Sequence, residues 1–297
     1  MKRLLLPIIL FISPFLALHG QRSELRFQHL GVEDGLSHSL VSSIVEDTLG
    51  FVWFGTQDGL NRYDGFGFKT YYKGKTSRSP SDSWITQLYA DRHNQLWIIY
   101  NGSGLERFDP QTETFHSYLP DPLKEGSISS VVFSGRQTYS SKRFFEDSEG
   151  QLWIGTEQGL NLYNRAEDHF TQYMSDPDDP ASLSDNRIVN IFECGRGYLW
   201  VGTINGLNRM DKLTGKVKRF MSAPSSDFQL RSPNISSGFC TPDGKIWVGT
   251  QAGLDIILEP YNEYSKVVHL VTEPLNPNHL PTIHNILMTT TGKMLVA

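Results

Sequence analysis

The chain has 297 residues, of which 38% are hydrophobic and 12% aromatic, and this composition is typical of a globular protein with a large core. Its formal net charge is −5 at pH 7. Phosphate binding requires clustered Lys and Arg, so with this mildly acidic net charge we expect no nucleic acid partner.

The N-terminal segment has the pattern of a secretory signal peptide. Residues 1–3 include two cations, and the apolar run over residues 4–18 is short for a membrane-spanning helix, although a membrane anchor is the alternative. We predict cleavage near Gly20-Gln21, which leaves residues 21–297 as the mature domain, with a net charge of −7 after the loss of those two cations. No later segment is apolar enough to cross a membrane, so we expect no direct membrane contact after cleavage.

From residue 51 onward, one sequence pattern returns at nearly even intervals, and a Trp marks each copy. The markers are Trp53, Trp97, Trp153, Trp200 and Trp247, with a sixth copy at residues 292–297, where Leu295 takes the Trp position. Their spacings are 44, 56, 47, 47 and 48 residues. A period in the forties with Trp and Gly-Leu signatures predicts one four-stranded propeller blade per repeat.

The first repeat shows the expected strands directly. The β-rich runs cover residues 41–46, 51–56, 60–63 and 68–72. An Asp-x-x-Gly turn joins the first two runs, and a second tight turn, Asp58-Gly59, joins the second run to the third. The second run is apolar on both faces, which indicates burial between neighbouring blades. There the Trp would fill the gap and the Gly two residues later would allow close approach.

These features predict an all-β fold, a β-propeller of four-stranded blades. We expect about five complete blades and the start of a sixth, truncated before ring closure, with seven blades when complete. Residues 27–30 resemble the fourth strand of a repeat. An N-terminal strand of this kind would complete the last blade and remove its open edge.

Cys194 and Cys240 occupy near-equivalent positions in successive repeats, at the end of the first strand. We expect them to lie in adjacent blades and some distance apart. Two buried free thiols are therefore favoured over a disulfide, although export to an oxidising compartment would permit one.

The candidate ligand-binding face carries the Gly-Leu turns and the loops that connect one blade to the next. The repeat between Trp97 and Trp153 is nine residues longer than the usual 47, and the surplus lies around residues 126–138. Function in repeat scaffolds is usually placed on such a face. The candidate ligand-binding residues are Asp58, Asn101, Arg136, Gln137, Glu157 and Asn205, and the alternative for each is a solvated loop.

No catalytic or metal-binding pattern stands out. His-Glu-x-x-His, Gly-x-Ser-x-Gly, phosphate-loop and Cys-x-x-Cys motifs are absent, and the nine His lack metal-ligand spacing. The acidic run at residues 176–179 lacks the spacing of a Ca²⁺ loop. Glu-Asp pairs at residues 46–47 and 146–147 recur at one repeat position, which indicates turn chemistry. We expect no catalytic residues, no metal and no cofactor.

The repeat resembles that of the two-component regulator propeller family, which reads roughly Gly-x-Ile-Trp-x-Gly-Thr-x-x-Gly-Leu-Asn-Arg-Tyr-Asp. The matching segments are residues 50–64, 150–164, 197–211 and 244–255, with residues 94–109 as a weaker copy. The resemblance covers nearly everything after the predicted signal peptide. The departures, Ile99-Tyr100 in place of Gly-Thr and Leu295 in place of Trp, affect single blades.

The resemblance implies the periplasmic half of a hybrid two-component system that is anchored in the inner membrane. Such propellers are often paired and precede a β-sandwich domain, a membrane helix, a histidine kinase, a receiver and a DNA-binding output. The implied function is sensing of a ligand, commonly a glycan-derived oligosaccharide. The implied partners are the downstream sensor and kinase domains, with a homodimer in the full-length context.

The resemblance also implies that this chain is non-enzymatic, since the kinase segment is not part of it. The alternative is a secreted propeller glycoside hydrolase or polysaccharide lyase, because propellers also carry catalysis. Such an enzyme needs paired carboxylates or a His/Tyr/Arg set that faces a cleft.

Overall fold

The computed structural model describes residues 28–102, 104–130, 143–195, 197–222, 229–262, 265–270 and 282–296. The chain divides into two units, residues 1–30 and 31–297. The predicted signal peptide and Phe27 lie outside the described residues. Residues 28–30 are described and form no strand, and the strand at 27–30 that would complete the last blade stays a prediction. No described strand pairs with them, and a strand requires a hydrogen-bonded partner.

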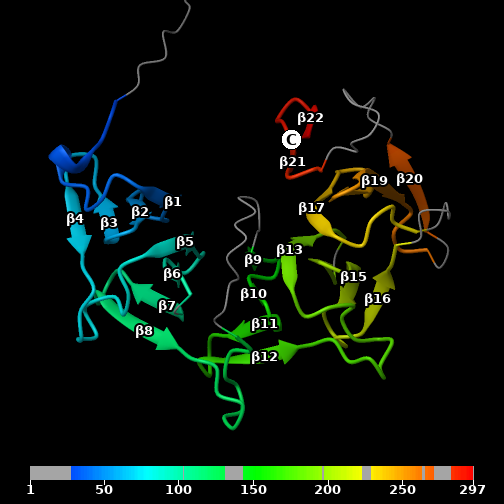
Figure 1. Cartoon of the computed structure of the whole chain (residues 1–297), viewed down its shortest axis with the longest axis horizontal. Coiled ribbons are helices and arrows are strands. Elements are labelled where there is room, and N and C mark those ends of the chain that lie inside the picture. Colours follow the sequence, from blue (N-terminus) through cyan, green and yellow to red (C-terminus); the bar gives the residue numbers. More distant parts are fainter. Residues whose placement is uncertain are drawn as a thin grey trace, which may run out of the picture. The chain divides into compact units, whose positions relative to one another are not determined.

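In the described part of residues 31–297, a short 3-10 helix, Val32–Asp34, precedes five four-stranded antiparallel sheets and a two-stranded one (Figure 1). The first sheet contains β1 (Val41–Glu46), β2 (Val52–Thr56), β3 (Gly59–Tyr63) and β4 (Phe68–Tyr71). The second contains β5 (Ile85–Ala90), β6 (Leu96–Tyr100), β7 (Gly104–Asp109) and β8 (Thr114–Tyr118). The third contains β9 (Phe144–Glu146), β10 (Leu152–Thr156), β11 (Gly159–Asn164) and β12 (His169–Tyr173).

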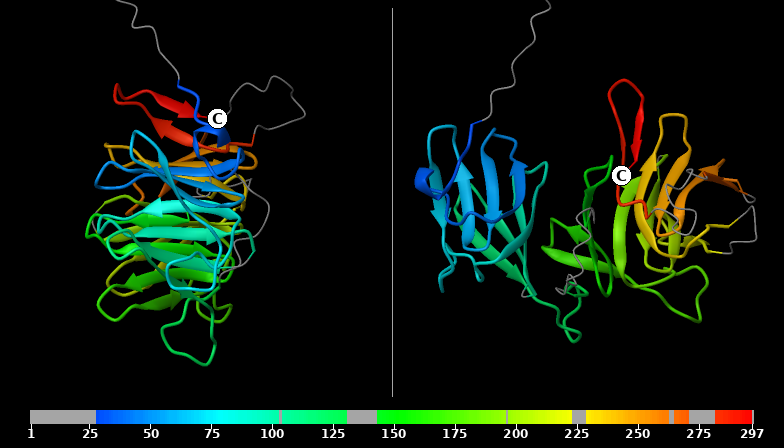
Figure 2. Two further views of the ribbon diagram at one scale, coloured as in Figure 1. Left: turned by 90° about the vertical axis from the view of Figure 1, so that its left-hand side faces the viewer. Right: turned by 45° about the horizontal axis from the view of Figure 1, so that its top comes forward.

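The fourth sheet contains β13 (Ile188–Glu193), β14 (Tyr198–Thr203), β15 (Gly206–Asp211) and β16 (Val217–Phe220). The fifth contains β17 (Ile235–Cys240), β18 (Ile246–Thr250), β19 (Gly253–Leu258) and β20 (Lys266–Leu270). The last sheet is the hairpin of β21 (Ile286–Met288) and β22 (Met294–Val296). Strands that follow one another in sequence are neighbours in every sheet, as Figure 2 also shows. The prediction of five complete blades and the start of a sixth is confirmed. In the described residues no helix is long and apolar enough to cross a membrane.

The Asp-x-x-Gly turn holds both the hairpin and the marker Trp. Asp47 Oδ1 accepts the backbone N–H groups of Leu49 and Phe51 at 2.9 and 3.0 Å, as its turn role predicts. Its second oxygen, Oδ2, accepts the indole N–H of Trp53 at 2.8 Å. The second and third sheets repeat this contact between Asp and indole. One carboxylate therefore orders the turn and fixes the ring orientation.

The marker Trp side chains fill the space between consecutive sheets, as predicted. The markers of the first four sheets, Trp53, Trp97, Trp153 and Trp200, are fully buried. Trp153 packs against Ile188, Ile191 and Leu199 of the next sheet, and the other junctions have equivalent clusters. The Gly two residues after the marker permits this approach. A Cβ on Gly155 would lie 2.5 Å from Ile188 Cγ2.

The two cysteines form a disulfide, so the preference for free thiols is wrong. Cys194 directly follows β13 and Cys240 ends β17, and their Cα atoms are 5.4 Å apart. These strands are the first strands of the fourth and fifth sheets, and they pack against each other. The ends of these two strands are therefore close enough for a bond.

Candidate functional site

The Gly-Leu turns lie beside the loops that enter the next sheet. The backbone N–H of Gly59 donates to the carbonyl of Ser83 at 2.8 Å, and Gly159 donates to Asn186 at 2.8 Å. Each entry loop is also held by a side chain of the sheet that it enters. In the third sheet, Asn161 Oδ1 accepts the N–H of Ser129 at 2.9 Å. The turns and entry loops therefore form one face, which we call the turn face.

Four predicted ligand-binding residues lie in these turns, each in a different sheet. Asp58, Asn101 and Asn205 are exposed, and Glu157 is half-buried. In the described part of the chain, no hydrogen bond or ion pair joins any two of them. Arg136 and Gln137 lie outside the described residues. The structure thus places four candidates on one face without gathering them into one cluster.

Glu157 is engaged by a cation that the sequence did not single out. Its Oε1 lies 3.5 Å from Nη2 of Arg143, and the two side chains are largely buried. Burial lowers the pKa of Arg143, and Glu157 opposes that change by favouring the charged form. This carboxylate is therefore less available to a ligand than Asp58 is.

Trp84 is an additional turn-face residue that sequence reasoning missed. It immediately precedes β5, and its side chain is 40% exposed. Its carbonyl accepts the N–H of Asn101 at 2.9 Å, and the adjacent Ser83 holds the turn that contains Asp58. The signal was available, because Trp84 is the Trp that falls outside the repeat frame. A flat indole with amide and carboxylate groups nearby suits a ligand with an apolar face and a polar rim.

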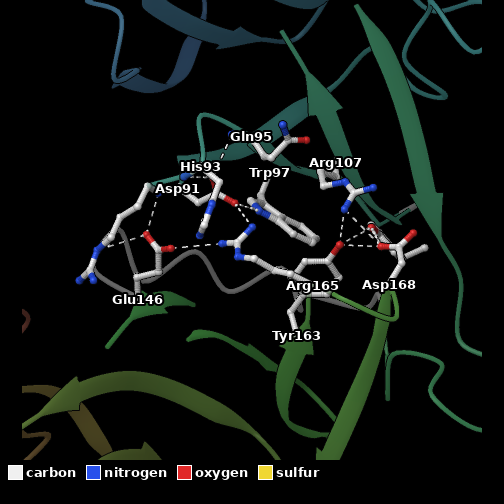
Figure 3. A network of polar contacts seen from close by, with 11 residues as sticks. Asp91, His93, Gln95, Trp97, Arg107, Glu146, Tyr163, Arg165 and Asp168 are labelled. Carbon is white, nitrogen blue, oxygen red and sulfur yellow. Dashed lines mark hydrogen bonds and ion pairs between the residues drawn. The ribbon is translucent and has the colours of Figure 1, made fainter. Parts of the chain in front are cut away.

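An ion-paired cluster fastens the second sheet to the third (Figure 3). Arg165, which follows β11, places Nη1 2.9 Å from Asp91 Oδ2 and Nη2 3.2 Å from Glu146 Oε1. Asp91 also accepts the indole N–H of Trp97 at 2.9 Å. Both carboxylates are buried, so the cation offsets their charge inside the junction. This cluster has a structural role and leaves no free carboxylate for a ligand.

The third and fourth sheets share the same arrangement. Lys212, which follows β15, lies 3.0 Å from Asp147 Oδ2 and 2.8 Å from Glu193 Oε1. Burial alone would lower the pKa of Lys212, but hydrogen bonds to the two carboxylates raise it well above its usual value. We call this arrangement a carboxylate clasp. It is a cation held between the turn Asp of one sheet and the first-strand Glu of the next.

A second polar cluster also joins the second and third sheets. It contains the His, Tyr and Arg residues that a propeller enzyme would need. The hydroxyl groups of Tyr118 and Tyr163 both donate to Asp168 Oδ1 at 2.6 Å, and Arg107 and His116 lie 3.3 and 3.5 Å from the carboxylate. Burial and the bond to Asp168 raise the pKa of Tyr163 to about 12 and raise that of Tyr118 further. Tyrosines held in their protonated form are poor general bases. This cluster therefore also favours a structural role.

In the described residues, no group of three or more His, Cys, Asp or Glu side chains could hold a metal ion. In the Glu-Asp pairs at residues 46–47 and 146–147, Asp47 and Asp147 bind turn N–H groups, as predicted. Their neighbours Glu46 and Glu146 end the first strands, and Glu146 pairs with Arg165.

Sheet topology and comparison with solved structures define the chain as a β-propeller protein. It superposes on the extracellular domain described for a hybrid two-component system of B. thetaiotaomicron with a TM-score of 0.62, 23% identity, and coverage of 91% of this chain and 40% of that one. It also resembles virginiamycin B lyase of Staphylococcus aureus, with a TM-score of 0.55, 13% identity, and coverage of 86% and 76%. At these identities, both comparisons show the fold alone.

The model of the two component regulator propeller matches residues 35–58 and 134–158. This chain carries repeats of the two-component regulator propeller family, as its sequence predicts. It is also 41% identical over 76 residues to Histidine kinase P4 of Formosa agariphila. That match covers 26% of this chain and 5% of the kinase, so the chain spans a small part of its curated relative.

Proposed function

We propose that this chain is the ligand-sensing propeller of a hybrid two-component sensor and that its ligand is an oligosaccharide. The observation that carries the ligand class is Trp84 on the turn face, between the turns of Asp58 and Asn101. The pyranose ring has an apolar C–H face that can pack on indole and hydroxyl groups that can bond to amides and carboxylates. The likeness to a histidine kinase and to the extracellular domain of a hybrid two-component system supports the sensing role.

The proposed role is non-catalytic. The Tyr118 and Tyr163 hydroxyls are committed to Asp168, and the carboxylates of the clasps are committed to Arg165 and Lys212. The likeness to virginiamycin B lyase favours the enzyme alternative through the fold only.

Trp84→Ala will weaken binding of the recognised sugar by about tenfold or more, which corresponds to about 1.4 kcal/mol. The reason is the loss of the exposed indole surface. Calorimetric titration of the chain with a panel of neutral and acidic oligosaccharides of two or more units measures the effect. Phe66→Ala is the matched control, because Phe66 is an exposed aromatic on the β3–β4 turn, at the opposite end of the first sheet. Equal affinity for Trp84→Ala and wild type would contradict the proposed site.

We also propose that the chain is exported to the periplasm after cleavage of residues 1–20. The disulfide supports this proposal, because disulfides persist mainly in oxidising compartments. N-terminal sequencing of the exported protein should give Gln21 as the first residue. Recovery of uncleaved Met1 protein in the membrane fraction would contradict this processing.

A further inference from the structure

The disulfide occupies the place of a carboxylate clasp at the junction of the fourth and fifth sheets. In the clasps, the turn residues Asp91 and Asp147 stand six positions before the marker Trp of their own repeats. Cys194 stands six positions before Trp200. It therefore replaces the turn Asp, and Trp200 has no turn carboxylate to accept its indole N–H.

The second half of the clasp is replaced in the same way. Glu146 and Glu193, the first-strand carboxylates of the two clasps, stand seven positions before their marker Trp. Cys240 stands seven positions before Trp247. The covalent bond thus joins the same two chain positions that a cation bridges at the two preceding junctions.

The position of the cation shows that no ionic clasp could form at this junction. Arg165 and Lys212 stand twelve positions after their marker Trp, directly after the third strand. The equivalent residue in the fifth repeat is Glu259, which carries the opposite charge. All three clasp positions therefore carry other residue types at this junction than at the two preceding ones, and the disulfide links the two sheets in place of the ion pairs.

The bond can be reached by a small reagent from the surface opposite the turn face. A pocket of about 540 Å³ lies over it, and its lining includes Glu193, Cys194, Cys240, Tyr261 and Met288. The Tyr261 hydroxyl donates to the backbone carbonyl of Cys194 and covers one side. Cys194 is buried and Cys240 is half-buried, so Cys240 Sγ is the more accessible sulfur.

We propose that Cys194–Cys240 is a redox-sensitive clasp, whose reduction loosens the junction of the fourth and fifth sheets. A dithiol reductant attacks Cys240 Sγ as the thiolate, the sulfur–sulfur bond breaks, and Cys194 leaves as a thiolate that takes up a proton. The second thiol of the reductant then displaces Cys240. The products are two cysteine thiols and the oxidised, cyclic form of the reductant. With neither a cation nor a covalent bond, apolar packing and the remaining hydrogen bonds, such as that from Tyr261 to the Cys194 carbonyl, then hold the fourth and fifth sheets together.

The test treats the full chain with dithiothreitol under native conditions and follows amide hydrogen exchange in β13 and β17. We expect iodoacetamide to label both cysteines after reduction, and exchange in these two strands to become about tenfold faster or more, while β1 and β5 keep their rates. Failure to label either cysteine would contradict the proposed accessibility. Unchanged exchange in the labelled protein would contradict the role of the bond as a clasp.

Two variants make the test specific. Cys194→Ser/Cys240→Ser should exchange like the reduced wild type and should not respond to dithiothreitol. Cys194→Asp/Cys240→Glu/Glu259→Arg rebuilds an ionic clasp and should restore slow exchange that resists dithiothreitol but weakens in high salt, since ion pairs are screened. A triple variant that exchanges as fast as the double-Ser variant would contradict the positional equivalence. The wild-type reduction decides the main proposal even where a variant fails to fold.

Discussion

Replacement of Trp153 by Ala will lower the free energy of unfolding by about 3–5 kcal/mol, the range for large-to-small changes at buried aromatic residues. The side chain is fully buried between the third and fourth sheets, where it contacts Leu160, Ile188 and Ile191. Its removal also deprives Asp147 of an indole hydrogen bond of 3.0 Å. Urea unfolding followed by circular dichroism measures the change.

Trp84→Ala serves as the matched control for this experiment. Its indole is 40% exposed and belongs to no inter-sheet cluster, so we expect a change within about 0.5 kcal/mol. A loss below about 1 kcal/mol for Trp153→Ala would mean that the markers do not carry the packing between sheets.

Lys212→Met will lower the free energy of unfolding by about 3–5 kcal/mol, because it leaves the fully buried Asp147 and the largely buried Glu193 without their shared cation. The Lys212 side chain is 4% exposed and that of Asp147 is fully buried. Lys245→Met is the control, since Lys245 pairs with Asp243 at an exposed site, where an ion pair contributes about 0–1 kcal/mol. Urea unfolding of both variants at neutral pH gives the comparison. Equal losses for the two variants would contradict the clasp.

The difference in the free energy of unfolding between wild type and Lys212→Met should also depend on pH. Burial alone would raise the pKa of Asp147, but the bonds from Trp153, Gln151 and Lys212 together lower it below its usual 3.8. A lowered folded-state pKa gives stability that is present above 3.8 and is lost as the pH falls through the folded value. The raised pKa of Lys212 gives stability that is present below 10.5 and is lost at still higher pH. The difference in the free energy of unfolding between wild type and Lys212→Met should therefore be largest between pH 3.8 and pH 10.5, and it should become smaller below and above this range.

The fold was predictable because its strands and turns repeat. The four runs expected in the first repeat agree with β1 to β4 within one residue at each end. The pairing of Cys194 with Cys240 was not predictable by the same means. A period shows that two positions are nearly equivalent, but it does not show that β13 and β17 pack against each other. The clasps were missed for the same reason, since Arg165 and Asp91 come from different repeats.

The sequence predicted which face of the sheets carries the candidate site, but it did not predict the contacts of the individual side chains. Turn chemistry places Asp58, Asn101 and Asn205 correctly at the ends of sheets. The pairing of Glu157 with Arg143 and the exposure of Trp84 depend on how entry loops fold over the turns, and spacing carries no such information.

The double attachment of the entry loops has a consequence for how such a protein can be altered. In the longest repeat, Ser129 is still held by Asn161, and Arg143 still binds Gly155 through its backbone. These two anchors flank residues 130–142, and β8 and β9 on either side are paired in regular register. A segment of different length and composition can be inserted between these anchors without a change in the packing between the sheets. On the binding face that we propose, loops can thus differ in length and sequence while the sheets remain the same.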